Sequence, residues 1–131
     1  FRTGRVLART VASSPWARPR AEGARALDLG TGSGVGAVFA ARRGYRVTAV
    51  DLNPEAVRCA RLNALLNGLE ERIEAREGDL FAPVAGEVFD LVLFNPPFFR
   101  GAPRSRIDLA WTDNATATSC NSTYCLYCFE Q

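Results

Sequence analysis

A glycine-rich run and three short polar motifs are the parts of this sequence whose residue types could do chemistry. The run reads DLGTGSG over residues 28–34 and follows an apolar stretch. Glycines let the chain turn sharply after a strand, and they let a ligand approach the backbone closely. The run therefore predicts a cofactor-binding turn, which we assign to Asp28, Gly30, Thr31, Gly32 and Gly34.

The glycines alone do not identify the cofactor. The spacing Gly32-x-Gly34-x-x-Ala37 also fits the dinucleotide pattern GxGxx(G/A). Asp51 ends the next apolar stretch, about 20 residues further on, where an acidic side chain can accept hydrogen bonds from ribose hydroxyls. That position suits NAD and S-adenosylmethionine equally, so an NAD-dependent oxidoreductase stays open at this point.

Two further segments extend the candidate cofactor site. Asp79 and Leu80 follow Gly78 after a third, weaker strand pattern. A carboxylate beside an apolar side chain could hold an adenine ring by its amino group and by one face. We assign Asp79 and Leu80 to the cofactor, together with Leu52, which lies next to Asp51. The alternative for Asp79 is a solvated loop carboxylate.

The tetrapeptide Asn95-Pro96-Pro97-Phe98 argues against an NAD-dependent oxidoreductase, because a dehydrogenase has no need for it after a buried strand. A methyltransferase that acts on an amide or exocyclic amine does need such a motif. An amide or exocyclic amine is a poor nucleophile, since its lone pair is delocalised. The Asn95 side-chain oxygen and the Pro96 carbonyl can each accept an N–H from such a nitrogen. The prolines stiffen the loop, so the acceptors are preorganised, and Phe98 offers a flat apolar face. We predict catalytic roles for these four residues and a cofactor contact for Asn95.

The elements that must position these motifs alternate along the chain. Apolar and β-branched runs predict strands over 26–29, 46–50, 72–76 and 89–94. Helical patterns lie between them over 35–43 and 54–66. This alternation predicts an α/β fold with a doubly wound, Rossmann-like parallel sheet. Because ligands bind beyond the carboxyl ends of such strands, we expect the motifs to meet at one rim.

Residues 26–111, with DLGTGSG, VDLN, GDL and NPPF in that order, resemble class I S-adenosylmethionine-dependent methyltransferases. The tetrapeptide is similar to that of the HemK group of protein glutamine methyltransferases, and to that of amino-methyltransferases acting on adenine or guanine. The resemblance implies that Asp28, Gly30, Gly32 and Asp51 bind S-adenosylmethionine, and that residues 95–98 hold the substrate nitrogen. The family sheet normally has seven strands, so we expect a domain truncated after its fourth strand.

Composition divides the chain into three parts. Residues 1–25 form a partial N-terminal segment, 26–111 the methyltransferase domain, and 112–131 an atypical tail without a basic residue. The abrupt change is explained either by a native tail or by an artefact such as a frameshift or a misread exon, and we favour the artefact. Three of the four cysteines lie in this tail and histidine is absent, so we expect no metal site and no Ser/His/Asp triad. Unpaired thiols and the lack of a long apolar run predict a cytoplasmic protein without a membrane span.

The sequence thus predicts an N-methyltransferase that acts on a planar nitrogen, with a glutamine of a translation release factor as the preferred target. Asp108 and Trp111 after the tetrapeptide resemble the HemK group, and the net charge of +2 is small for a nucleic-acid enzyme. An rRNA or DNA amino-methyltransferase is the first alternative, because Arg100, Arg104 and Arg106 could contact phosphates. The second alternative is a non-catalytic fragment that binds S-adenosylmethionine or nucleic acid.

Overall fold

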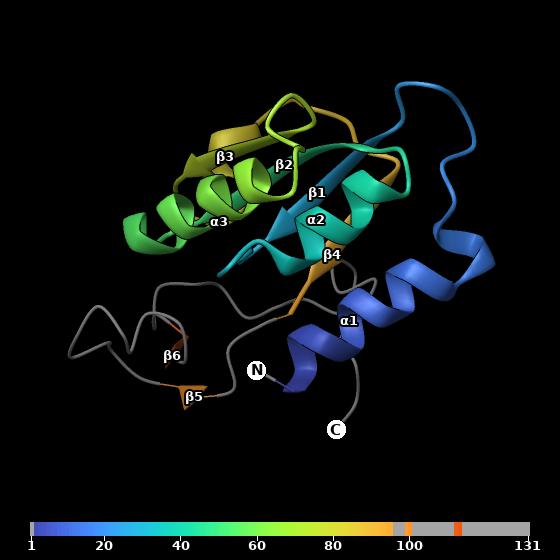
Figure 1. The fold of residues 1–131 in the computed structure, drawn as a ribbon. Helices are drawn as coiled ribbons and strands as arrows, with labels where there is room; N and C mark the ends of the chain where they lie inside the picture. Colours follow the sequence, from blue (N-terminus) through green and yellow to red (C-terminus); the bar gives the residue numbers. More distant parts are fainter. Residues whose placement is uncertain (1, 96–98, 101–111, 114–131) are drawn as a thin grey trace.

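Strand β1 (Arg25–Leu29) is an inner strand of a parallel four-stranded sheet, from which the chain builds outward (Figure 1). The computed structural model describes residues 2–95, 99–100 and 112–113. On one side of β1 lie β2 (Arg46–Asp51) and then β3 (Ile73–Glu77). On the other side lies β4 (Leu91–Phe94). The order β3-β2-β1-β4 confirms the predicted parallel α/β sheet.

The inner strands are buried because their side chains are apolar on both faces. In β1, Ala26 and Leu27 point to opposite faces and are each no more than 1% exposed. A strand covered on both faces reads as a continuous apolar run rather than as an alternating one. This is why the short runs of the sequence predicted strands correctly, although β3 begins one residue later and β4 two residues later than predicted.

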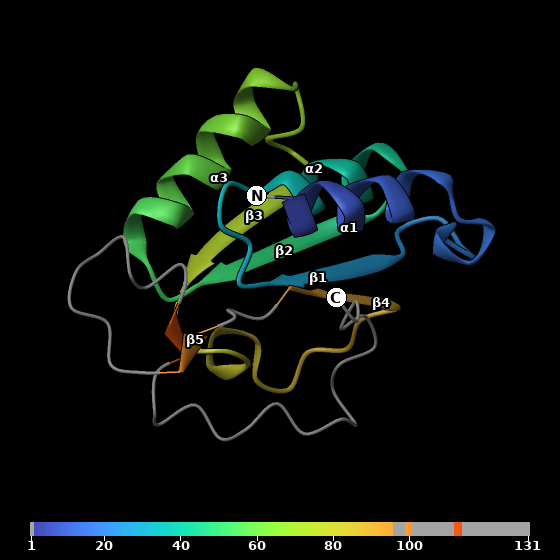
Figure 2. The same ribbon diagram turned by 90° about the horizontal axis from the view of Figure 1, so that it is seen from below.

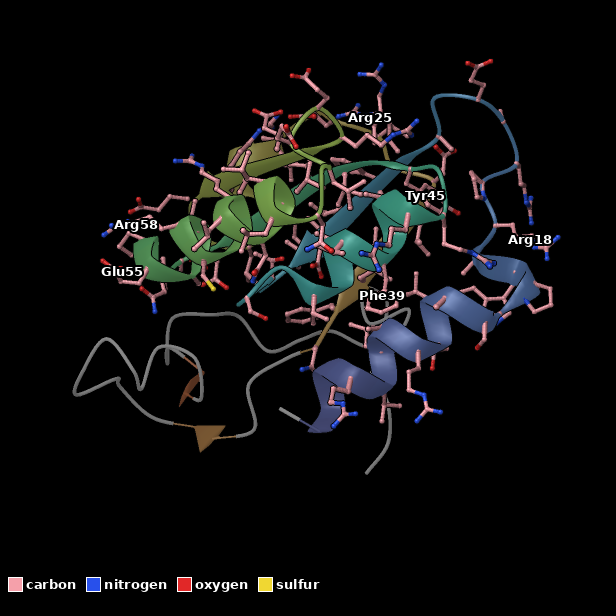
Figure 3. The ribbon with its side chains drawn as sticks, in the orientation of Figure 1. Arg18, Arg25, Phe39, Tyr45, Glu55 and Arg58 are labelled. Carbon is pink, nitrogen blue, oxygen red and sulfur yellow. The ribbon has the colours of Figure 1, made fainter. Side chains whose placement is uncertain are left out.

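Helix α3 (Pro54–Leu66) has the bounds that the sequence predicts. The Oδ1 of Asn53 accepts a hydrogen bond from the backbone N–H of Glu55 at 3.0 Å, which caps the helix. Proline at the first helical position costs no hydrogen bond there. Figure 3 shows Glu55 and Arg58 projecting from the first turns of α3, away from the sheet. The asparagine cap and the proline were therefore sufficient to predict where α3 begins.

Helix α1 (Arg2–Ser13) was not predicted and lies within the segment 1–25. It packs along α2 (Val35–Arg42), on the side of α2 where Figure 3 places Phe39. Leu7 and Val11 fill the contact and are at most 4% exposed. Apolar side chains four residues apart share a helix face, but two such residues in a segment rich in arginine form too short a pattern to predict a helix.

The three helices cover one face of the sheet, and the segment between β3 and β4 lies on the other (Figure 2). On that second face Val84 packs with Leu27, Leu29 and Val50 in a small apolar cluster. Among the described residues, no helix is long and apolar enough to cross a membrane. The remaining short elements are the 3-10 turns η1 (Pro15–Ala17) and η2 (Ala82–Val84), and a parallel pair of two-residue strands, β5 (Phe99–Arg100) and β6 (Thr112–Asp113).

Candidate cofactor and substrate site

The strand register brings the sequence motifs to one edge of the sheet. Leu29 of β1 pairs with Val50 of β2 and with Phe94 of β4. The residues that follow these three, namely Gly30, Asp51 and Asn95, therefore leave the sheet side by side. Asp51 pairs in turn with Glu77, and its backbone carbonyl accepts a hydrogen bond from the N–H of Gly78 at 3.0 Å. The predicted convergence at one rim is observed for these positions.

The chain changes direction across the sheet between β1 and β4. From β1 it moves outward to β2 and β3, and it then returns past β1 to reach β4. In open α/β sheets, ligands bind beyond the carboxyl ends of the strands at such a switch point. Gly30 and Asn95 are the first residues beyond this switch point.

The carboxylate of Asp28 is buried beneath the glycine turn. Asp28 is 3% exposed. Its Oδ2 accepts hydrogen bonds from the Oγ1 of Thr31 at 2.6 Å and from the backbone N–H of Ala37 at 2.9 Å. A Cβ on Gly36 would lie 2.9 Å from the same Oδ2, so only glycine leaves room for the carboxylate there. Asp28 thus ties the start of α2 to the end of β1.

Burial raises the pKa of the Asp28 carboxyl to about 6, because the charged form loses its hydration. The hydrogen bonds from Thr31 and Ala37 oppose this shift of the pKa, and the nearby Asp51 carboxylate adds to it. The two aspartates therefore differ in environment, one being enclosed in the protein and the other partly open at the rim.

Asp51 holds the glycine turn from the opposite side. Its Oδ2 accepts a hydrogen bond from the N–H of Gly32 at 2.8 Å, and its Oδ1 accepts one from the N–H of Asn53 at 2.9 Å. The backbone N–H of Thr31 also donates to the carbonyl of Val50 at 3.0 Å. Each carboxylate oxygen can accept more than one hydrogen bond, so Asp51 keeps capacity for hydroxyl groups of a ligand.

The glycine turn has room for a cofactor. Gly30, Gly32 and Gly34 have φ angles of 61°, 55° and 81°, a region that favours glycine. A Cβ on Gly32 would meet no heavy atom within 4 Å, so open space lies above this residue. The residues present therefore fit a nucleoside cofactor laid over the turn.

Apolar side chains lie at the ends of β2 and β3. Leu52 is 40% exposed and Phe81 is 39% exposed, while Leu80 is half-buried. Leu80 has a φ of 42°, which is unusual for a residue with a side chain and marks a constrained turn. Asp79 is exposed beside them. The rim therefore carries apolar surface of the kind that a purine ring covers, and Phe81 was missed by the sequence analysis.

The substrate motif is described only in part. Asn95 follows β4 and is half-buried. The other predicted substrate residues, Pro96, Pro97 and Phe98, lie outside the described residues, as do Arg104, Arg106, Asp108 and Trp111. Among the described residues, no group of three or more His, Cys, Asp or Glu side chains could hold a metal ion. Cys59, the one cysteine in that part of the chain, is exposed on α3.

Two structural contributors were not foreseen from the sequence. Gly36 admits the Asp28 carboxylate, and Asn63 of α3 donates a hydrogen bond from its Nδ2 to the carbonyl of Ser33 at 2.7 Å. Asparagine is unfavourable inside helices because its side chain competes for backbone groups. An asparagine in the middle of a predicted helix was therefore the sequence feature that could have indicated a tertiary contact of Asn63.

A parallel sheet with a glycine turn after its first strand and an acidic residue ending its second defines a Rossmann-like, cofactor-binding α/β domain. The chain belongs to the methyltransferase small domain family, whose model matches residues 4–119. This match rules out the NAD-dependent oxidoreductase, which the glycine pattern alone had left open. S-adenosylmethionine is the cofactor of this class of methyltransferase.

Curated relatives carry names that refer to two kinds of substrate. Over 91 residues the chain is 44% identical to the release factor glutamine methyltransferase of Deinococcus radiodurans, which covers 68% of the chain and 32% of that protein. Over 74 residues it is 43% identical to ribosomal RNA small subunit methyltransferase C of Alcanivorax borkumensis, which covers 56% of the chain and 22% of that protein. The chain thus spans less than a third of the length of either relative.

A solved structure agrees with the fold and with the cofactor class. The tRNA (uracil-54, C5)-methyltransferase of Pyrococcus abyssi, in complex with S-adenosyl-L-homocysteine, superposes with a TM-score of 0.56 at 28% identity. The superposition covers 72% of this chain and 22% of that one.

Proposed function

We propose that the protein is a cytoplasmic N-methyltransferase that moves a methyl group from S-adenosylmethionine to a planar nitrogen, with a protein glutamine as its substrate. The observation that carries this proposal is the position of Asn95 relative to the glycine turn. Leu29 and Phe94 are paired neighbours, so Gly30 and Asn95 are the next residues on two adjacent strands. A cofactor over the turn would then have Asn95 beside it.

The cofactor-binding role falls to residues of the turn and of the rim. Gly30, Gly32 and Gly34 offer close approach to the backbone, and Asp51 accepts hydrogen bonds from the ribose hydroxyls. Leu52, Asp79 and Leu80 lie where the purine would extend along the rim, the two leucines as apolar faces and the carboxylate as an acceptor. When bound, S-adenosylmethionine supplies a methyl carbon that is already activated by a positively charged sulfur.

Thr31 and Asp28 support the cofactor indirectly in this proposal. The Thr31 hydroxyl is directed at Asp28 by their hydrogen bond of 2.6 Å, and both side chains are buried. They fix the turn that the cofactor contacts. This refines the sequence-based expectation that both residues contact the cofactor themselves.

The chain's own contribution to the chemistry is to align the nucleophile. The Asn95 side-chain oxygen accepts one N–H of the substrate nitrogen, and the Pro96 carbonyl is proposed to accept the other. Two fixed acceptors orient the nitrogen and favour the movement of charge onto it as the new bond forms. Pro97 and Phe98 are proposed to stiffen this loop and to cover the planar group. No general base is required, because the activated donor makes alignment the main requirement. The nitrogen gains the methyl group as the carbon–sulfur bond breaks to leave a neutral thioether, and the nitrogen then releases one proton to water.

A glutamine of a release factor is the preferred target. The release factor glutamine methyltransferase of Deinococcus radiodurans is 44% identical to this chain over 91 residues. The net charge of +2 is small, whereas phosphate contacts dominate the affinity of nucleic-acid enzymes. An rRNA amino group is the second candidate, since the relative named as an rRNA methyltransferase is 43% identical over 74 residues.

A radiolabelled methyl assay separates these candidates. The protein is incubated with labelled S-adenosylmethionine and, separately, with release factor, structured rRNA or duplex DNA. Label in the release factor that disappears when its acceptor glutamine is replaced by alanine supports the proposal. Label found only in nucleic acid would select the second candidate. A protein that binds S-adenosylhomocysteine but labels no substrate would favour a non-catalytic binding fragment.

A further inference from the structure

Asn63 connects helix α3 to the glycine turn. It lies in the third turn of α3, is half-buried, and donates from Nδ2 to the backbone carbonyl of Ser33 at 2.7 Å. Three residues earlier on the same helix face, Ala60 lies against Gly34. Helix α3 therefore contacts two consecutive residues of the turn, one by a hydrogen bond and one by close packing.

The Asn63 donor stands where a continued helix would have given the Ser33 carbonyl a backbone partner. In a continued α-helix, the N–H of Ala37 would donate to the carbonyl four residues earlier, which is that of Ser33. Here the N–H of Ala37 donates to the Asp28 carboxylate at 2.9 Å instead. The first hydrogen bond of the helical pattern runs from Val38 to Gly34, at 2.9 Å. Asp28 thus accepts the N–H that would have extended α2 by one residue at its N-terminal end, and Asn63 donates to the Ser33 carbonyl in place of that N–H.

We propose that Asn63 is a positioning residue that holds the glycine turn in the shape that binds S-adenosylmethionine. The role rests on the proposed placement of the cofactor over the turn. Without the Asn63 donor, the Ser33 carbonyl is free to recover the N–H of Ala37, and the turn rewinds toward the helix. The turn then spends less time in its binding shape, and the apparent dissociation constant rises in inverse proportion.

Asn67, which caps the C-terminal end of α3, provides the control. Its Oδ1 accepts a hydrogen bond from Arg42 at 2.6 Å, near the far end of α2. Asn63 and Asn67 are therefore both asparagines that join α3 to the α2 region, but Asn63 alone contacts the turn. Substitution of either asparagine would loosen the packing of α3 against α2. Only substitution of Asn63 would change the shape of the turn.

The test combines hydrogen exchange with cofactor binding in the full chain. Wild type, Asn63→Ala, Asn63→Asp and Asn67→Ala are compared for exchange over residues 30–36, and for binding of S-adenosylhomocysteine by calorimetry. The aspartate variant keeps the shape of Asn63 but presents an acceptor to the Ser33 carbonyl. Loss of one hydrogen bond predicts about 2- to 12-fold faster exchange in the turn and a similar rise in the dissociation constant for both Asn63 variants. Asn67→Ala should change neither.

The Michaelis constant provides a second readout. For both Asn63 variants, the KM for S-adenosylmethionine should rise while kcat at saturating cofactor stays near that of wild type, which a general loss of structure would not produce. Unchanged exchange over residues 30–36 would overturn the proposal, and so would faster exchange with unchanged cofactor affinity. A wild-type chain that binds no S-adenosylhomocysteine would instead overturn the proposed function itself, and with it the role of the turn.

Discussion

Gly34 and Ala60 approach each other so closely that no side chain fits between them. A Cβ on Gly34 would lie 2.9 Å from the Cα of Ala60, which is a backbone atom and cannot rotate away. Gly34 also has a φ of 81°, where residues with side chains are strained. The contact joins the last residue of the glycine turn to the middle of α3.

Gly34→Ala should therefore be strongly destabilising. Backbone strain of about 1 kcal/mol adds to an overpacking cost of about 1–3 kcal/mol. Urea unfolding should show the sum as a lower midpoint. Gly68→Ala is the control, because Gly68 has a φ of 65° but open space where a Cβ would lie. If both variants lost the same stability, strain alone would explain Gly34 and the packing against Ala60 would have no energetic weight.

Asp28 should make the domain more stable on mild acidification. Its folded pKa of about 6 lies above the ordinary value of 3.8, so the folded state binds the proton first. Between these pH values the stability contributed by Asp28 falls as the pH rises, and it is fully present below about 4. Each unit of the shift corresponds to about 1.4 kcal/mol.

The comparison with Asp28→Asn isolates this effect from other titrating groups. Glu74 and Glu87 have lowered pKa values because they accept hydrogen bonds from Arg76, so they oppose the trend below their ordinary range. Both groups are retained in the variant and cancel in the difference. The free energy of unfolding of wild type minus that of Asp28→Asn is the quantity to follow from pH 4 to 7. This difference should rise as the pH is lowered from about 6 toward 4. Parallel curves for wild type and variant would contradict a raised pKa of Asp28.

Asp51→Ala should weaken cofactor binding. Hydrogen bonds to a charged acceptor contribute about 1.5–3 kcal/mol, which corresponds to a roughly 10- to 150-fold higher dissociation constant for S-adenosylhomocysteine. Asp90→Ala is a suitable control, because the Oδ2 of Asp90 accepts from the backbone N–H of Arg25 at 2.8 Å at the opposite end of the sheet. The control should lose stability without losing affinity. Unchanged affinity in Asp51→Ala would show that Asp51 supports the turn and does not bind the cofactor.

Local signals in the sequence were sufficient for the sheet and for α3. The apolar runs around Leu27 and Val50, and the Asn53-Pro54 helix start, act over a few residues and need no tertiary context. The convergence of Gly30, Asp51 and Asn95 also followed, because the carboxyl ends of parallel strands share one edge.

Other features depended on contacts between distant segments. The burial of Asp28 requires the space above Gly36 and the N–H of Ala37, neither of which the motif itself reveals. The contact of Asn63 with Ser33 joins residues 30 positions apart. Helix α1 is stabilised by packing on α2, which a short amphipathic pattern does not specify alone.

Asn95→Ala should lower the rate of methyl transfer far more than it lowers cofactor affinity. In the proposed site the Asn95 oxygen accepts a hydrogen bond from the substrate nitrogen, and this bond strengthens as charge moves onto the nitrogen in the transition state. Removal of one such preorganised group costs about 100- to 1,000-fold in kcat. Because the proposed acceptor of Asn95 acts on the substrate nitrogen, the same substitution should change the dissociation constant of S-adenosylhomocysteine only slightly. Asn95→Asp, which keeps an acceptor of the same length, should retain more activity than Asn95→Ala.

Single-turnover assays with a saturating substrate measure the rate of methyl transfer, and calorimetry measures the affinity for S-adenosylhomocysteine. Equal losses in turnover and in cofactor affinity would show that Asn95 supports the cofactor or the fold, and not the substrate nitrogen.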